Sequence, residues 1–243
     1  MSSKYHQDVT VSSHNLVDKD FQSMLYPIDF MQTVYFCPKY RIKEDRILPT
    51  NVTLHLFALS GLTMFVCLYM YRTYAMHYVI DQETTLYIFS YYDIFSFSLG
   101  LVLNYIIHVV RTRRNILFIL NLQEVHRNVN DEKSFKRFTV QNWAAFICYI
   151  SLYISINIFV TIYLQIPVME FICGFIIMCF DMNMILASRF IKLLCDKIVL
   201  WNGQLKNLKW SENDSENRCD VIFQDYVNIL DCYDMFKSTY HLL

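Results

Sequence analysis

The chain has 243 residues, of which 55% are hydrophobic, 16% aromatic and 18% charged, and its formal net charge is −1. Soluble domains carry about a quarter charged residues, so this balance indicates apolar surroundings rather than water. The nearly neutral net charge gives no reason to expect a nucleic-acid partner. The small number of glycines and prolines, four of each, disfavours a β architecture with many turns.

Residues 1–46 form an N-terminal segment that we expect to lie in the cytosol. Its first residues, MSSKYHQDVTVSS, contain neither the apolar core nor the small-residue cleavage site of a signal peptide. Membrane insertion is therefore expected to begin with an internal segment. Four basic residues stand near the end of this part: Lys39, Arg41, Lys43 and Arg46.

The first two candidate transmembrane spans cover residues 47–72 and 84–110. A helix needs about 20 mostly apolar residues to cross a bilayer. Between Arg46 and Arg72 there are 25 uncharged residues, and the second span is interrupted only by Asp93. Residues 111–137 follow with many basic residues and recurring apolar positions, which predict a cytosolic helical loop.

The next apolar run contains 32 uncharged residues from 138 to 169. As one helix it would be about 48 Å long, whereas the bilayer core measures about 30 Å. Pro167 cannot continue a helix but suits the first turn of a new one. We therefore expect two spans, 138–165 and 167–189, with a turn near residues 165–167.

Residues 190–243 are predicted to form a cytosolic helical tail that leads toward a missing fifth span. The stretch RFIKLLCDKIVLWNGQLKNL continues the fourth span as an amphipathic helix. A polar break, KWSENDSENRCD, is followed by VIFQDYVNILDCYDMFKSTYHLL, which has apolar residues at helical spacing. The predicted fold class is an all-α integral membrane protein with four transmembrane helices and long cytosolic helix extensions.

The distribution of lysine and arginine predicts the orientation. Sixteen basic residues flank the spans on the side of the N-terminus, the middle loop and the tail, and Arg72 alone lies on the other side. Because cytosolic loops carry the excess of basic residues, all three parts are expected in the cytosol. The sequons at Asn51 and Asn213 should then remain unglycosylated.

Several polar residues fall at membrane depth on common helix faces. The second span carries Asp93, Asn104 and His108 on one stripe, and the fourth carries Asp181. An ionisable residue at this depth is a functional candidate, but polar residues also form hydrogen bonds that hold membrane helices together. We favour the structural interpretation for Asn104, His108 and Asp181, and leave both open for Asp93.

An outward-facing ligand pocket is predicted among the second, third and fourth spans. Tyr149, Tyr153, Asn157 and Thr161 form one polar and aromatic face of the third span. Tyrosine combines a flat apolar surface with a hydroxyl, which suits small, partly polar organic molecules. The alternative is the aromatic belt found at membrane interfaces. The predicted ligand contacts are Tyr92, Asp93, Tyr153 and Asn157.

The sequence gives no indication of an enzyme. It contains no GxSxG, HExxH or P-loop motif, and its seven histidines do not group. The eight cysteines have no zinc-ligand spacing. No catalytic residue, metal ligand or cofactor is therefore predicted.

Together with the closing YVNILDCYDMFKSTYHLL, the cytosolic N-terminus, the tyrosine- and phenylalanine-rich spans and the basic helical loop resemble the insect gustatory receptors. This resemblance implies a subunit of a ligand-gated cation channel in the plasma membrane. It further implies a small-molecule tastant as ligand, the lipid bilayer as surroundings, and other receptor subunits as partners in a homo- or heterotetramer.

The chain departs from this family in length. A seven-span receptor has a Thr-Tyr pair near its last span, and neither that motif nor the fifth to seventh spans can be matched here. The resemblance therefore implies either a partial gene model or a truncated receptor, and the chain alone is not expected to conduct ions. Two alternatives remain: a four-span accessory or scaffold protein, and a segment of an ion-coupled transporter that uses Asp93, Asp181 and His108 as a relay.

Overall fold

A computed structural model describes residues 15–79, 84–129, 131–164, 168–206 and 215–240. These parts are almost entirely helical. The helices are α1 (Lys19–Val34), α2 (Val52–Val79), α3 (Thr84–Asn128), α4 (Glu132–Leu164), α5 (Val168–Lys206) and α6 (Ser215–Tyr240), and a short hairpin of β1 (Arg41–Lys43) and β2 (Arg46–Leu48) precedes α2.

Four of the described helices, α2 to α5, are long and apolar enough to cross a membrane. They keep large apolar side chains exposed along their length, such as Ile156, Phe159 and Ile162 on α4, which are 52%, 57% and 66% exposed. So much exposed apolar surface is expected where lipid rather than water surrounds a helix. This finding confirms the predicted all-α fold with four candidate spans and fits an integral membrane protein.

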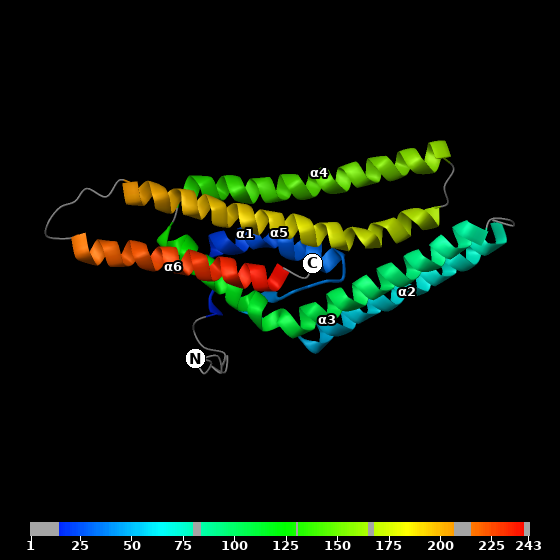
Figure 1. Cartoon of the computed structure of the whole chain (residues 1–243), viewed down its shortest axis with the longest axis horizontal. Helices are drawn as coiled ribbons and strands as arrows, with labels where there is room; N and C mark the ends of the chain where they lie inside the picture. The colour runs from blue at the N-terminus through cyan, green and yellow to red at the C-terminus, as the bar shows by residue number, and fades with distance from the viewer. Residues whose placement is uncertain (1–14, 80–83, 130, 165–167, 207–214, 241–243) are drawn as a thin grey trace.

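The helices form two long antiparallel pairs (Figure 1), of α2 with α3 and of α4 with α5. The short α1 lies between the pairs, and α6 lies along α3 and α5. As predicted, α3 and α5 continue as helices beyond the apolar segments, to Asn128 and Lys206, and the closing segment forms a further helix, α6. The turn expected near residues 165–167 lies outside the described residues.

Two clusters of buried apolar side chains hold these helices together. We call the first the basal core; it joins α1, the hairpin, α3, α4, α5 and α6, and its largest members include Phe21, Ile47, Phe118, Phe190 and Ile229. We call the second the span core; it joins the end of α1 to α2, α3, α4 and α5, and includes Met31, Tyr35, Phe65, Phe146 and Met182. Among the described helices, α1 and α3 to α5 contribute to both cores.

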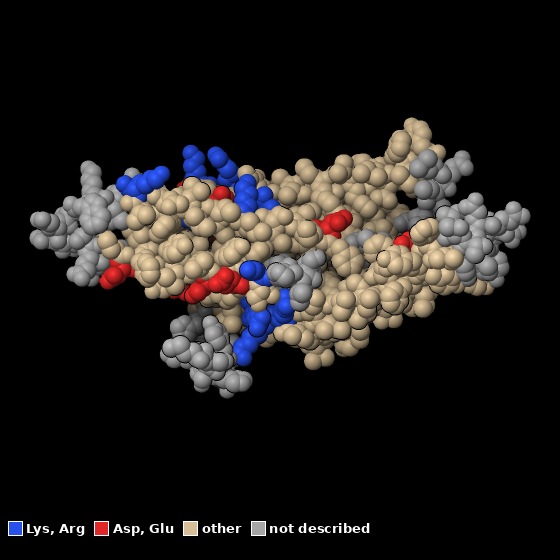
Figure 2. Space-filling view, viewed as in Figure 1, with Lys and Arg blue, Asp and Glu red and all other residues tan. Residues whose placement is uncertain are grey.

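Charged side chains gather at the basal end of the molecule. On the face seen in Figure 2, lysine and arginine lie over the half that contains α6 and the beginning of α4, and the other half is mainly uncharged. This separation places the basal core among charged surfaces and the far parts of α2 to α5 among apolar ones.

The N-terminal segment contains an unpredicted helix, α1. Its buried residues Phe21, Met24, Leu25 and Ile28 recur at helical spacing, but Pro27 lies inside the helix and hides this signal, because proline removes a helical hydrogen bond. The buried amide of Gln123 on α3 fixes the entry of the chain into α1. It donates to the Leu16 carbonyl oxygen at 3.0 Å and accepts from the Asp18 amide at 3.3 Å.

The chain after α1 lies against α2 through a close approach at Gly61. Phe36 has a left-handed backbone conformation with φ 59° and stacks on Phe57 of α2, with ring centroids 4.7 Å apart. A Cβ added at Gly61 would overlap the side chain of Phe36. Glycine is therefore required for this contact.

Candidate functional site

Two of the predicted ligand contacts lie on α3. Tyr92 is 66% exposed, and the adjacent Asp93 is half-buried. Neither forms a hydrogen bond, an ion pair or a ring contact with another described residue. Tyr92 is therefore largely uncovered, whereas Asp93 is partly covered by its surroundings.

The other two predicted contacts lie on α4 and take part in the packing of α4 on α5. The Tyr153 hydroxyl donates to the Phe171 carbonyl oxygen at 3.1 Å, and its ring lies 5.8 Å from the Phe171 ring. Asn157 donates to the Tyr153 carbonyl oxygen at 2.8 Å, within the same helix. A Cβ at Gly174 would lie 2.7 Å from the Tyr153 oxygen, so glycine permits this approach.

The structure therefore forms two separate pairs from the four residues. Tyr92 and Asp93 are neighbours on α3, Tyr153 and Asn157 are neighbours on α4, and no hydrogen bond or ring contact between described residues joins the pairs. None of the four lines the cavities described below. The outward-facing pocket remains a prediction.

Two polar residues in the spans form the interhelical hydrogen bonds that the structural interpretation requires. The Tyr149 hydroxyl donates to a carboxylate oxygen of Asp181 at 2.7 Å, which links α4 to α5. Asn104, only 3% exposed, accepts from Asn183 at 3.4 Å and donates to the Cys37 sulfur at 3.4 Å. These bonds connect α3 with α5 and with the chain after α1.

His108 behaves differently from Asn104. It is 8% exposed, and its Nε2 has no hydrogen-bond partner among the described residues. It lines a small cavity of about 20 Å³ together with Thr50, His55 and Tyr105. The interhelical hydrogen bond expected of this histidine is not seen at Nε2.

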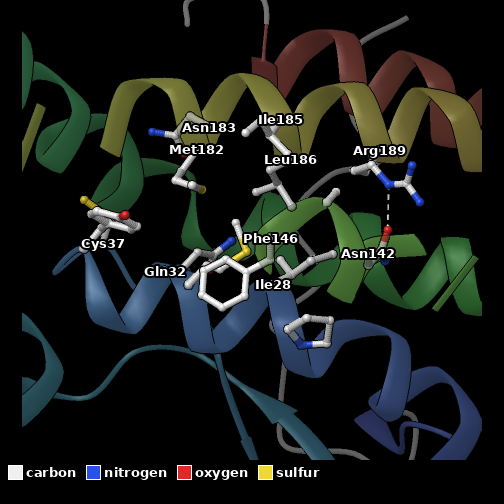
Figure 3. A pocket seen from close by; sticks show the side chains of 14 residues that line it. Ile28, Gln32, Cys37, Asn142, Phe146, Met182, Asn183, Ile185, Leu186 and Arg189 are labelled. Carbon is white, nitrogen blue, oxygen red and sulfur yellow. Dashed lines mark hydrogen bonds between the residues drawn. The ribbon is translucent and has the colours of Figure 1, made fainter. Parts of the chain in front are cut away.

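A cleft between α1, α4 and α5 combines apolar walls with buried polar groups. Its enclosed space is about 30 Å³, and the empty volume reaches about 510 Å³ when the open mouth is included. Figure 3 shows Gln32, Asn142, Phe146 and Arg189 on its walls. Arg189 donates from Nε to the Asn142 oxygen at 2.7 Å, and its guanidinium lies 4.6 Å from the centre of the Phe138 ring.

The segment after α1 also buries a lysine beside this cleft. The backbone amide of Lys39 donates to the Gln32 oxygen at 3.2 Å, and its side chain is almost fully enclosed. Burial lowers the pKa of the Lys39 ammonium to about 7 because the charged form loses its hydration. This group lies outside the candidate spans.

A second buried lysine, Lys197, links α5 to the end of α3 beside the basal core. Lys197 of α5 donates to the Val129 carbonyl oxygen at 2.6 Å and lies 2.9 Å from His126 Nδ1. The His126 ring in turn lies 3.9 Å from the ring of Phe135. These contacts hold the end of α3 and the beginning of α4 on α5, which is a structural role.

No role at these sites was predicted from the sequence for Gln32, Lys39, Asn142 or Asn183. Gln32 and Lys39 lie in the N-terminal segment, where no helix was predicted. Asn142 and Asn183 lie inside predicted spans, and their polar side chains at membrane depth were the signal that could have found them. Within the described ranges no group of three or more histidine, cysteine or acidic residues could hold a metal ion.

No family model, curated protein or solved structure matches the chain. The fold and the geometry of its polar sites are therefore the basis for any functional argument.

Proposed function

We propose that the chain forms the four-span part of a gustatory chemoreceptor subunit in the plasma membrane, which detects small soluble tastants. The observation that carries this proposal is the charge asymmetry: sixteen basic residues flank the spans on one side and one on the other. With four candidate spans, this asymmetry favours a cytosolic N-terminus, middle loop and tail. A G-protein-coupled receptor requires the opposite orientation.

The ligand is proposed to bind among the outer parts of α3, α4 and α5, at Tyr92, Asp93, Tyr153 and Asn157. The Tyr153 hydroxyl already contacts the α5 backbone, so a ligand that contacts Tyr153 would act on the packing of α4 against α5. Because α5 runs from the span core into the basal core, a shift of α5 would reach the basal end.

The proposed channel assembly requires subunit contacts, and α6 offers a suitable surface. Its buried stripe packs in the basal core, and a second apolar stripe remains exposed. This stripe consists of Phe223, Tyr226, Leu230 and Tyr233, which are 65%, 40%, 45% and 48% exposed. Since α6 is not among the candidate spans, a neighbouring subunit is the proposed cover for this stripe.

The orientation is tested by labelling single cysteines with a membrane-impermeant maleimide. Two otherwise cysteine-free variants are compared: one keeps Cys219, exposed on α6, and the other carries Thr84→Cys at the start of α3. In intact cells we expect labelling of the Thr84→Cys variant only, and after permeabilisation labelling of both. Labelling of Cys219 in intact cells would exclude the proposed orientation.

Ligand binding is tested with the purified chain in lipid nanodiscs, using sucrose and caffeine as probes of two tastant classes. We expect saturable binding of one of them, with Kd raised about tenfold in Asp93→Asn and Tyr92→Phe. Tyr163→Phe is the control, because Tyr163 is 71% exposed on α4 and is not a predicted contact. An equal effect of Tyr163→Phe, or no saturable binding, would contradict the pocket.

The relay of an ion-coupled transporter receives no support from the described contacts. Asp181 is bonded to Tyr149, and no hydrogen bond between described residues connects Asp93, Asp181 and His108. An accessory protein differs from the proposed receptor in having no saturable tastant site, so the same binding experiment separates the two.

A further inference from the structure

Two buried side-chain amides face the cleft between α1, α4 and α5 with unused donors. Gln32 is 8% exposed and Asn142 is 5% exposed, and the amide nitrogens of both lack hydrogen-bond partners among the described residues. Their oxygens already accept bonds, from the Lys39 backbone amide and from Arg189 Nε. These bonds fix the orientation of each amide, so the nitrogen is the group left free.

The cleft suits a ligand that is apolar over most of its length and carries hydrogen-bond acceptors. Its walls include the apolar side chains of Ile28, Met31, Phe146, Met182 and Leu186. In Figure 3, Gln32 lies on the side of Cys37 and Asn183, and Asn142 lies on the side of Arg189. The cavity volume of about 30 Å³ has room for water only, so a longer molecule would lie mostly across the open mouth.

The mouth of the cleft carries positive charge. The Arg189 guanidinium and the Lys192 ammonium both donate to the Gln141 side-chain oxygen, at 3.5 Å and 3.1 Å. Neither forms an ion pair with a described carboxylate. Asp196 of the same helix interacts electrostatically with Arg189. An anionic group at this position would therefore meet two cations and one nearby carboxylate, with a net positive charge.

Aromatic residues beside the cleft indicate the membrane interface. Tyr26 of α1 is 60% exposed, and its ring lies 6.0 Å from that of Trp143 on α4. Exposed tyrosine and tryptophan are typical of the headgroup level of a bilayer. Basic pockets between spans at this level are suited to lipid headgroups.

We propose that this cleft binds an anionic phospholipid. In this arrangement the lipid phosphate lies at Arg189 and Lys192. The ester carbonyl oxygens accept hydrogen bonds from the side-chain N–H groups of Asn142 and Gln32. An acyl chain covers the apolar wall of the cleft. A free inorganic anion would leave that wall uncovered. The proposal rests on the membrane location of α4 and α5 and is independent of the receptor proposal.

The experiment measures lipid binding to the purified full chain in detergent by native mass spectrometry. The probes are dioctanoyl phosphatidylglycerol, which is anionic, and dioctanoyl phosphatidylcholine, which is neutral overall. We expect Kd to be at least tenfold lower for phosphatidylglycerol. Lys192→Gln, a change at an exposed side chain, should reduce this preference severalfold, and Arg189→Gln combined with Lys192→Gln should abolish it.

The amides are tested with Gln32→Leu combined with Asn142→Leu, which should weaken binding of both lipids about tenfold. The matched controls are Lys237→Gln and Gln224→Leu, exposed positions on α6 that should change nothing. Equal binding of the two lipids by the wild-type chain, or unchanged binding in the double leucine variant, would overturn the proposal. Displacement of phosphatidylglycerol by millimolar inorganic phosphate would identify a free-anion site instead.

Discussion

At the scale of single residues, Gly61 decides how closely the chain after α1 can approach α2. A side chain at this position meets Phe36, which is already held by its stacking on Phe57. Gly203, in the basal part of α5, has no atom within 4 Å of an added Cβ. The two glycines therefore form a matched pair for one substitution.

We expect Gly61→Ala to destabilise the protein by about 1–3 kcal/mol, because overlap with Phe36 forces the chain to move. Gly203→Ala should instead stabilise it by up to about 1 kcal/mol, since alanine favours a helix over glycine. The measurement is the thermal unfolding of both variants in the same detergent. Equal effects of the two substitutions would contradict the close approach at Gly61.

Lys39 makes stability depend on pH. Its pKa is lowered to about 7 in the folded protein by burial, whereas an unfolded lysine titrates near about 10.4. Between these values the unfolded chain binds more protons than the folded one, so stability rises with pH from about 7 to about 10, by up to about 1.4 kcal/mol per pH unit.

We therefore expect the melting temperature of the wild-type chain to rise from pH 6.5 to pH 9, and Lys39→Met to melt higher at pH 6.5 and to show a flatter profile. The control is Lys43→Met, an exposed position on the hairpin, which should keep the wild-type slope. A wild-type slope in Lys39→Met would show that another group causes the pH dependence.

At the scale of helices, α1 links the two cores. Phe21 near its beginning is fully buried in the basal core, with its ring 6.0 Å from that of Phe135. Met31 near its end belongs to the span core. Phe30, on the same helix, is 45% exposed and contacts Phe146 at its edge.

Phe21→Ala is expected to lower stability by about 3–5 kcal/mol, because a large cavity opens in the basal core. Phe30→Ala should cost less than half as much, because the side chain is already half exposed. Thermal unfolding of the two variants measures the difference. Similar losses would mean that α1 does not pack in the basal core as described.

Most long helices could be predicted from the sequence, because an uninterrupted apolar run of about 20 residues is typical of a membrane-spanning helix. The start of α3 at Thr84 agrees with the predicted span. The helix α1 was not predicted, because Pro27 lies inside it and obscures the helical spacing of its buried residues, which pack on α4 and α5. The hairpin was also not predicted. Its turn places Glu44 and Asp45 in the left-handed region, with φ of 53° and 61°, and such values are uncommon for residues other than glycine.

The candidate site was less predictable than the fold. A stripe of polar residues identifies a helix face, and it correctly led to hydrogen bonds at Asn104 and Asp181. It does not show which faces meet. Gln32 and Asn142 come together in one cleft only because α1 lies against α4 and α5, and this packing depends on contacts between segments more than 100 residues apart.

At the scale of the whole molecule, the proposed orientation predicts the glycosylation state. Asn51 is at the start of α2, where its side-chain oxygen accepts from the Leu54 amide at 3.1 Å and caps the helix. With a cytosolic N-terminus neither Asn51 nor Asn213 meets the glycosylation machinery. Glycosidase treatment should leave the electrophoretic mobility of the protein unchanged.

The control for this prediction is a variant in which a long Gly/Ser linker with a sequon is inserted between Asp81 and Gln82, in the sequence between α2 and α3. This variant should be glycosylated and should shift on treatment. A shift of the wild-type protein would place Asn51 or Asn213 on the opposite side of the membrane.

The position of α1 has a mechanical consequence. Helix α1 has 16 residues and is about 24 Å long at 1.5 Å per residue. One end packs in the basal core and the other in the span core, so a tilt of α1 at the span core would displace its end in the basal core. Pro27 removes one bond from the middle of this helix. The helix α1 can therefore bend near Pro27. How easily it bends there determines how much of a displacement at one end of α1 is transmitted to the other end.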